Sequence, residues 1–310
     1  MLQLVVTCAK AKRGQIPARL RLRSVRQRQV IAAANLWVER LREATGPTVP
    51  VSELYRGDHW KAASDAAAVA VGVGGRSWVC SAGYGLLPFD AAVRPYSATF
   101  TAGDPDSVAR LVAPEADDVN AVWWAALADW EGPATGAPRQ LAEIAAQAPT
   151  DLLVVTVSEP YLRALTPDLL TARARLSAPR RLLVLCGGAP ENHLLADNLV
   201  RWDSRVQIVD GALTSMNARV ARRLLQDVQP RRLTLAAARE RVASWATTAP
   251  SRSRPERQRV SDDEVCEFIR DRMAEVPSLS PSALHREFRD SGLACERLRF
   301  LSLLRTISEE

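Results

Sequence analysis

Short apolar runs alternate with segments of helix length along most of the chain, and this alternation constrains the fold more than any other feature. Buried strands are predicted at Leu2–Thr7, Ser77–Cys80, Asp151–Val157, Arg181–Cys186 and Arg205–Val209. Helices are predicted at Val25–Glu43, Asp58–Val71, Asp117–Trp130, Arg139–Gln147, Thr166–Leu176, Asn217–Asp227 and Thr234–Trp245. Strands separated by helices pair in parallel and are covered on both faces. We therefore predict an α/β fold with a parallel sheet of about five strands flanked by helices.

A stretch rich in proline, serine and arginine ends this pattern at residues 246–260, and its composition is typical of a linker. Beyond it, Ser261 and Glu264 have the spacing of a capping box, and Ser280 precedes a proline as an N-cap does. We therefore predict an α/β catalytic domain at 1–245, a linker at 246–260 and a helical domain at 261–310.

The helical domain is predicted to contain three short helices with a tight turn around Gly292 before the last. This order resembles a helix-turn-helix unit, which favours DNA binding. An oligomerisation or capping bundle is the alternative, because residues 246–310 hold eleven arginines against twelve acidic residues.

Several classes of site are not indicated by the sequence. The five cysteines are scattered without a C-x-x-C pair, so neither a metal site nor a disulfide framework is predicted, and no cofactor-binding fingerprint occurs. No window holds a run of about 18 uncharged apolar residues, so we expect a cytoplasmic protein with no membrane contact. No obligate protein partner is evident.

Positive charge is concentrated near the N-terminus. The net charge is +6, yet the segment from residue 10 to residue 28 carries eight basic residues and no acidic one. Such one-sided charge favours a polyanion, and a solvated basic surface is the alternative. The predicted DNA contacts are Lys10, Lys12, Arg13, Arg19, Arg21, Arg23, Asn217, Arg219, Arg297 and Arg299.

A turn of small residues follows the strand at Ser77–Cys80. Glycines at the carboxyl end of a strand let a ligand approach the backbone, and ligands of α/β sheets bind at that edge. We therefore predict a pocket with Asp90 as its catalytic carboxylate, although a turn-forming role for this residue is equally open. The predicted substrate-binding residues are Ser81, Ala82, Gly83, Tyr84, Gly85, Tyr96, Ser97, Arg56, His59 and Trp60.

Three of these residues come from the cluster Tyr55–Lys61. Arg56 suits a phosphate, His59 suits a sugar hydroxyl or a leaving base, and Trp60 suits stacking. Asp58 precedes a predicted helix and is interpreted as its N-cap. A structural role for His59 is the alternative.

The sequence Ser81-Ala-Gly-Tyr-Gly-Leu-Leu87, followed by Asp90 and Pro95-Tyr96, resembles the S-x-x-Y-G-L-L…D…P-Y signature of YaaA-like and DpdA-neighbouring bacterial proteins. Within that group it is most similar to antiphage DNA glycosylases that excise glucosylated hydroxymethylcytosine. The resemblance implies a monofunctional glycosylase that binds modified double-stranded phage DNA, flips the base and leaves an abasic site, without a cofactor.

Two other functions are compatible with this resemblance, namely a non-enzymatic DNA-binding stress or regulatory protein and a base-exchange ribosyltransferase of deazaguanine pathways. For a glycosylase, only Lys10, Lys12 and Lys61 offer a side-chain amine as nucleophile. No sequence feature indicates a desolvated lysine, so we expect water to be the nucleophile.

Overall fold

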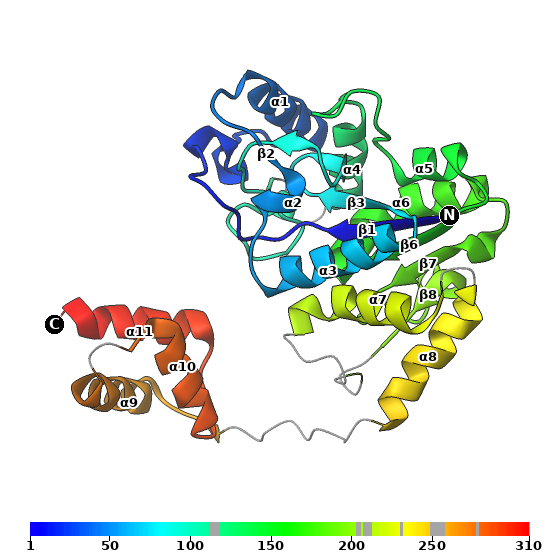
Figure 1. Ribbon diagram of the computed structural model, residues 1–310. Helices are drawn as coiled ribbons and strands as arrows, with labels where there is room; N and C mark the ends of the chain where they lie inside the picture. Colours follow the sequence, from blue (N-terminus) through cyan, green and yellow to red (C-terminus); the bar gives the residue numbers. More distant parts are fainter. Residues whose placement is uncertain are drawn as a thin grey trace. The chain divides into compact units, whose positions relative to one another are not determined.

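The computed structural model describes residues 1–111, 118–202, 206, 213–229, 232–248, 258–276 and 279–309. Among them, six strands form one sheet in the order β4-β3-β1-β6-β7-β8 (Figure 1). The strands are β1 (Leu2–Thr7), β3 (Arg76–Ser81), β4 (Gly85–Pro88), β6 (Leu152–Thr156), β7 (Leu182–Leu185) and β8 (Leu199–Val200). All pairings are parallel except that of β3 with β4. The predicted α/β fold with a mostly parallel sheet is confirmed.

Two of these strands were not predicted. β4 is a four-residue strand that pairs antiparallel with β3, and β8 has only two residues. Both are too short to give a clear apolar run. The predicted strand Arg205–Val209 lies outside the described residues except for Val206.

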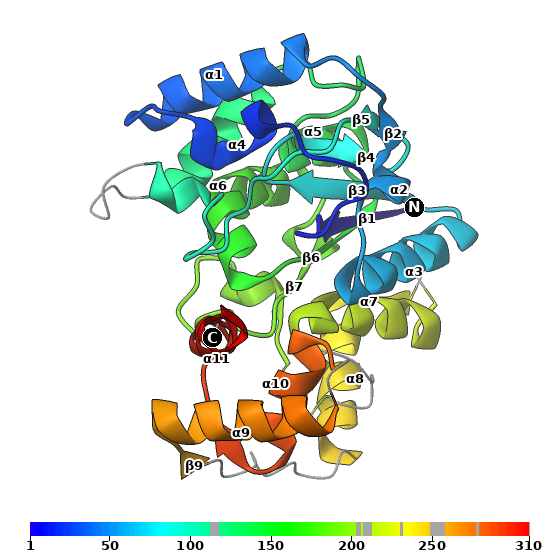
Figure 2. The same ribbon diagram turned by 90° about the vertical axis from the view of Figure 1, so that its left-hand side faces the viewer.

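Helices cover both faces of the sheet (Figure 2). One face carries α1 (Val30–Glu43), α4 (Val119–Ala128), α5 (Leu141–Gln147) and α6 (Glu159–Arg175), and the other carries α3 (Asp58–Gly72), α7 (Met216–Asp227) and α8 (Leu235–Thr248). Small buried side chains such as Ala63 and Ala66 let α3 pack closely. In α7, Val220, Leu224 and Leu225 face the core as predicted, and these apolar contacts hold the layers together.

Short elements complete this unit. α2 (Val51–Leu54) follows β2 (Val49–Pro50), which pairs with β5 (Ala92–Val93). The segment before α1 forms two 3₁₀ turns, at Ala18–Leu20 and Leu22–Ser24, so the helix starts later than predicted. No helix within the described ranges is long and apolar enough to cross a membrane.

The chain forms two compact units, Met1–Pro250 and Ser251–Glu310. The second contains β9 (Gln258–Arg259), α9 (Asp262–Glu275), α10 (Pro281–Asp290), β10 (Leu293–Ala294) and α11 (Arg297–Glu309). Its core is separate and is built around Ile269, Phe288 and Phe300. The capping box of Ser261 and Glu264 is present, and the Ser280 hydroxyl caps α10. The helix-turn-helix identity of this unit stays a prediction.

Candidate functional site at the carboxyl edge of the sheet

A cavity of about 550 Å³ opens at the carboxyl ends of β1 and β6. From β1 the chain continues to β3 on one side, and it later returns to β6 on the other side of β1. Ligands of open α/β sheets bind where the strand order reverses in this way. Residues of five segments meet there: those after β1 and β6, the start of α3, the loop at residues 98–101 and the start of α7. The cavity is therefore the first candidate for a ligand site.

His59 lies in the first turn of α3 and lines this cavity. Its Nε2 is 3.1 Å from both the hydroxyl and the backbone carbonyl oxygen of Thr7. Its Nδ1 is buried and has no hydrogen-bond partner of normal geometry among the described residues. Burial lowers the pKa of His59. This effect outweighs the carbonyls of Thr7 and Thr214 and the charge of Asp58, all of which raise that pKa. The ring is therefore neutral near pH 7, and its Nδ1 can accept a proton when Nε2 donates to the Thr7 carbonyl.

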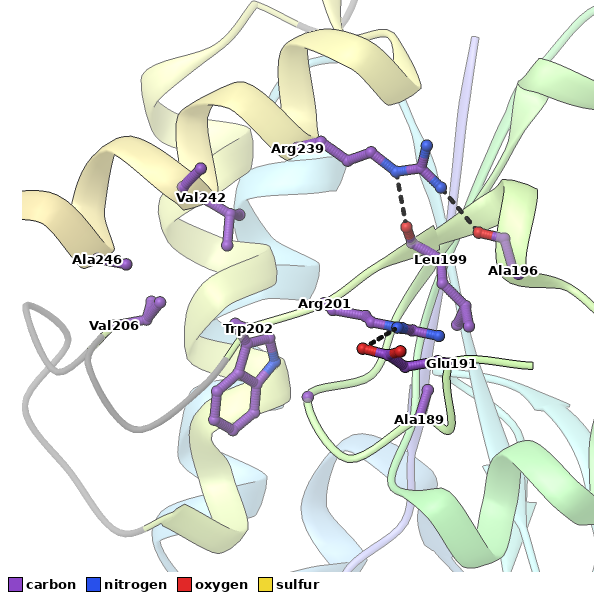
Figure 3. A pocket seen from close by; sticks show the side chains of 12 residues that line it. Ala189, Glu191, Ala196, Leu199, Arg201, Trp202, Val206, Arg239, Val242 and Ala246 are labelled. Carbon is purple, nitrogen blue, oxygen red and sulfur yellow. Dashed lines mark hydrogen bonds and ion pairs between the residues drawn. The ribbon is translucent and has the colours of Figure 1, made fainter. Parts of the chain in front are cut away.

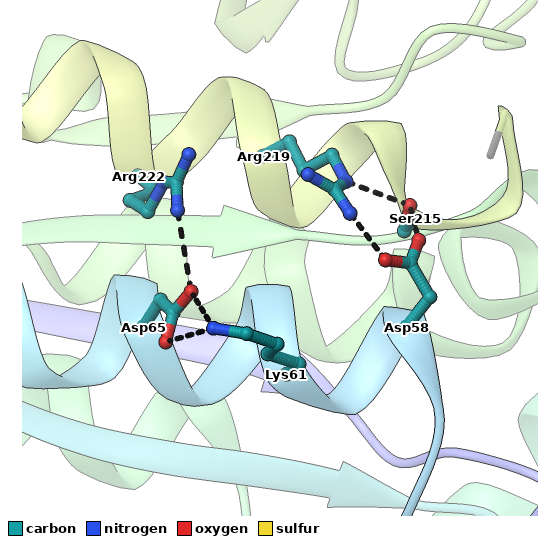
Figure 4. Close-up of polar contacts among 6 residues, drawn as sticks. All are labelled: Asp58, Lys61, Asp65, Ser215, Arg219 and Arg222. Atoms are coloured by element: carbon teal, nitrogen blue, oxygen red, sulfur yellow. Dashed lines mark hydrogen bonds and ion pairs between the residues drawn. The ribbon is translucent and has the colours of Figure 1, made fainter. Parts of the chain in front are cut away.

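Asp58 begins α3 and also lines the cavity. Figure 4 shows its two carboxylate oxygens against α7, where the Ser215 hydroxyl and the Arg219 guanidinium donate to them. Asp58 was predicted to be the N-cap of this helix, but Gly57 occupies that position. The hydrogen bonds from Ser215 and Arg219 instead fix the Asp58 carboxylate beside His59. Arg219 was predicted to contact DNA, but its side chain is 16% exposed and is occupied by this ion pair.

Two further charged groups line the cavity. Lys10 Nζ lies 2.5 Å from an oxygen of Asp104. Although burial opposes it, hydrogen bonds from Lys10 and from the Asp106 amide lower the pKa of Asp104. The lysine is thus tied to a carboxylate, whereas the Arg56 side chain is exposed and makes no hydrogen bond or ion pair within the described residues.

The part of the cavity next to β1 and α6 is built from buried protonated groups. The Cys8 thiol and the Tyr161 hydroxyl are 3.0 Å apart, and both residues line the cavity. Burial raises the pKa of Tyr161 well above its ordinary value, so the phenol stays neutral. Neither residue was predicted for the site: Tyr161 precedes the helix predicted at Thr166–Leu176, whereas α6 already begins at Glu159.

The glycine turn does not form the floor of the cavity. The Ser81 hydroxyl accepts hydrogen bonds from the amides of Gly83 and Tyr84 and lies 2.6 Å from the Tyr96 hydroxyl. Tyr84 and Tyr96 are 3% and 0% exposed, so neither ring can stack on a base without leaving the core. The prediction that these residues line an open pocket is corrected, because side chains from several elements bury the turn.

Arg139 explains why the turn is so well fixed. This buried guanidinium donates to the carbonyls of Tyr84, Leu86, Leu127 and Trp130. Burial lowers its pKa to about 10, so it keeps its charge at neutral pH. The backbone groups predicted to bind a ligand are therefore already used, and Gly85 has a φ of +76° with no room for a side chain beside Arg139.

The remaining predicted substrate-binding residues are also buried or occupied. Ala82 is fully buried and its carbonyl accepts from the Trp123 indole. Trp60 is 4% exposed and stacks on Phe89 with 5.4 Å between ring centroids. The Ser97 hydroxyl donates to Asp106. Of the predicted substrate-binding set, Arg56 and His59 line the cavity and these three do not.

Asp90 is exposed and does not line the cavity. The reason is the antiparallel direction of β4, in which Gly85 pairs with Ser81 and Pro88 pairs with Trp78. The hairpin carries the chain back from the carboxyl edge of the sheet before Asp90 is reached. This placement argues against Asp90 as the carboxylate of this cavity.

Lys12 overturns the expectation that no lysine is desolvated. Its Nζ lies 4.3 Å from the centroid of the Tyr96 ring and donates to the carbonyls of Ala9 and Lys10. Burial lowers the pKa of Lys12 despite the nearby charges of Asp104 and Asp106. The amine is held beside the tyrosines and does not line the cavity, which also removes it as an exposed phosphate contact.

Several other predicted DNA contacts have partners within the protein. Arg19 pairs with Glu43, Arg23 with Asp106 and Arg299 with Asp262. Arg297 donates to the Ser282 hydroxyl. Arg13 is exposed and Arg21 is half-buried.

Asn217, the remaining predicted contact, lines the cavity, and both ends of its side-chain amide make hydrogen bonds within the protein. Its Nδ2 donates to the Val157 carbonyl, and its Oδ1 accepts from the Gly187 amide and the Trp202 indole. It therefore joins β6 and β7 to α7 rather than reaching outwards.

A second cavity of about 840 Å³ lies beyond Asn217, near β7 and β8 (Figure 3). Arg239 donates there to the carbonyls of Ala196 and Leu199, and Arg201 lies 3.9 Å from Glu191. The Trp202 ring occupies the space above Gly187, where a Cβ atom would be 2.4 Å from it. Because its cations already bind carbonyls or a carboxylate, this cavity offers less chemistry than the first.

In the part of the chain that the structure describes, no three His, Cys, Asp or Glu side chains gather as metal ligands would. The chain was also compared with protein-family models, curated proteins and solved structures, and none of them matches it.

Proposed function

We propose that this chain hydrolyses an N-glycosidic bond in double-stranded DNA, with the cavity at β1 and β6 as the active site. The proposal is supported by one observation above the others: a fixed carboxylate, Asp58, lies beside a neutral histidine in a cavity of nucleotide size. The resemblance of residues 81–96 supports a modified cytosine of phage DNA as the base, and hence a role in antiviral defence in the cytoplasm.

The chemistry follows from the oxocarbenium character of the transition state. As the C1′–N bond breaks, its electron pair leaves with the base and positive charge develops at the sugar. Asp58 stabilises that charge, and water then adds to C1′. Nδ1 of His59, which has no hydrogen-bond partner of normal geometry among the described residues, takes the proton of that water and passes it to the departed base. The products are the free base and an abasic site, and no covalent enzyme intermediate is formed.

Entry of the base requires the nucleotide to leave the duplex. We assign Arg56 to the phosphate beside the flipped nucleotide, because its exposed side chain has no carboxylate partner among the described residues, whereas Lys10 is paired with Asp104. The helical unit, with its helix-turn-helix-like order, is the proposed second contact with the duplex. In this scheme Asp58 replaces Asp90 as the catalytic carboxylate.

The first prediction is that Asp58→Asn lowers the rate of base release by about 10²-fold or more, because the amide cannot stabilise the cation. Asp65→Asn is the matched control, since Asp65 also joins α3 to α7, through Arg222, but lies outside the cavity (Figure 4). Asp90→Asn should release base at the wild-type rate. Abasic sites and free base are measured on glucosylated phage DNA and on unmodified DNA.

Each outcome has a distinct meaning. Equal loss in Asp58→Asn and Asp65→Asn would assign Asp58 to helix packing alone. Loss in Asp90→Asn alone would restore that residue as the catalyst. Binding without base release favours the non-enzymatic DNA-binding alternative, and incorporation of an added base favours a transferase.

A further inference from the structure

A second basic feature lies on the α/β unit, apart from the proposed active site. Residues 22–28 and the loop at residues 105–111 enclose a hollow of about 770 Å³. Four arginines line it, namely Arg23, Arg26, Arg28 and Arg110. No acidic side chain of the described residues is among those that line it.

Three of the four arginines have no side-chain partner among the described residues. Arg23 lies 3.4 Å from Asp106, whereas the side chains of Arg26, Arg28 and Arg110 are exposed and make no hydrogen bond or ion pair within the described ranges. Guanidinium groups do not lose their proton in proteins, so their mutual repulsion is relieved only by an anion. Dissolved salt ions can supply that anion, so unpaired arginines alone do not indicate a specific binding site, and a second observation is needed.

The scaffold beneath the arginines supplies that support. The buried Asp106 carboxylate accepts hydrogen bonds from the Arg23 amide at 2.9 Å and from the Ser97 hydroxyl at 2.7 Å. The first of these bonds holds the segment at residues 22–28 against the loop at residues 105–111. Ser107 is 1% exposed and lines the hollow, and its hydroxyl has no hydrogen-bond partner in the part of the chain that the structure describes. A buried hydroxyl without a partner is costly, and an anion in the hollow would satisfy it.

We propose that this hollow binds the phosphodiester backbone of a nucleic acid. Guanidinium groups match phosphate oxygens in pairs, and the hollow is larger than one phosphate group requires. The same loop reaches both sites, because Thr99 and Thr101 line the active-site cavity while Ser107 and Arg110 line the hollow. This inference rests on the proposed function in one respect: a strand that enters the cavity would pass beside the hollow.

The test removes Arg26, Arg28 and Arg110 together by substitution with Gln in the full chain. The control triple replaces three exposed arginines outside the hollow. Arg42 lies in the last turn of α1, Arg76 is the first residue of β3 and Arg180 lies just before β7. Binding of a short unmodified duplex is measured against salt concentration. The hollow triple should lower the log–log slope by about 2 to 3, and the control triple by less than about 1.

Equal losses in both triples, or no loss in either, would overturn the proposal. Equally strong competition by inorganic triphosphate and by the duplex would also overturn the backbone assignment, because the hollow would then serve free phosphates. This experiment measures binding and not base release. A wild-type protein that binds DNA but releases no base therefore contradicts the proposed function and leaves this inference standing.

Ser107→Ala provides a second route in case the hollow triple does not fold. The hydroxyl bonds to no described residue and its burial is costly, so its removal should leave thermal stability unchanged or raise it. Binding of the duplex should weaken by roughly three- to tenfold. Ser64→Ala removes another buried unpartnered hydroxyl outside the hollow and should bind as the wild type does. Wild-type binding by Ser107→Ala, with an unfolded triple, would end the proposal.

Discussion

His59 and Asp58 show how residue-level geometry changes a functional interpretation. From the sequence, a histidine at a helix start and an aspartate before it suit structural roles equally well. Among the described residues, Nδ1 of His59 has no hydrogen-bond partner of normal geometry, and Asp58 lines the same cavity. By contrast, Tyr84 and Tyr96 looked available for stacking, and burial removes that role. Exposure cannot be derived from residue type, because aromatic rings serve cores and binding sites alike.

The lowered pKa of His59 predicts acid sensitivity. The unfolded imidazole titrates near 6.5, and the folded one titrates below that value because burial disfavours its charged form. The unfolded chain thus binds more protons, so the stabilising contribution is present above pH 6.5 and is lost as the pH falls toward the folded pKa. Each unit of depression corresponds to about 1.4 kcal/mol.

His59→Gln should therefore flatten the fall in unfolding free energy between pH 7 and pH 5, measured by urea denaturation. His193 is the control, because burial and Arg201 also lower its pKa although it is less deeply buried. His193→Gln should change the pH dependence less. A His59→Gln curve parallel to that of the wild type would show that the ring is not desolvated in solution.

At the scale of elements, the sequence predicted what depends on long apolar patterns. The predicted ends of β1, β3, β6 and β7 lie within one or two residues of the observed ends, and the same holds for α3 and α7. β4 was missed because Leu86 and Leu87 stand between glycine and proline in a segment that looks like a loop. That omission displaced the predicted site, since the direction of β4 decides on which edge of the sheet Asp90 lies.

The turn that joins β3 to β4 predicts a sharp stability effect. A Cβ atom at Gly83 would lie 2.3 Å from Cε2 of the Tyr96 ring, whose hydroxyl is held by Ser81 and Tyr55. Gly83→Ala should therefore lower the unfolding free energy by about 2 kcal/mol or more, as overpacked cores do. The measurement is urea denaturation of the full chain.

Gly72 provides the matched control for this turn. It ends α3, and a Cβ atom there would meet nothing within 4 Å. Gly72→Ala should leave stability unchanged or raise it slightly, since alanine favours the helix. Equal stability of both variants would mean that the Tyr96 ring moves aside easily, and the turn would then be open to a ligand after all.

At the scale of the whole molecule, the two units differ in charge as well as in fold. Residues 251–310 hold eleven arginines and twelve acidic residues, and Arg272 and Arg299 are paired within the unit. The basic segment and the arginine-lined hollow belong to the α/β unit instead. We therefore expect the α/β unit to supply most of the salt-dependent binding, while any contribution of the helical unit comes from uncharged or base-edge contacts.

Truncation after Thr248 tests this division. The cut preserves α8, whose Val242 and Trp245 are buried in the core of the first unit, so the shortened chain should stay folded. If the helical unit holds the duplex during the reaction, KM should rise by about tenfold while kcat is retained, because uniform binding is lost. The slope of log affinity against log salt should change by less than about 1, since an acidic unit releases few counterions from DNA. A slope that falls by several units would place the main phosphate contacts in the helical unit, and an insoluble fragment would show that the α/β unit needs the helices in order to fold.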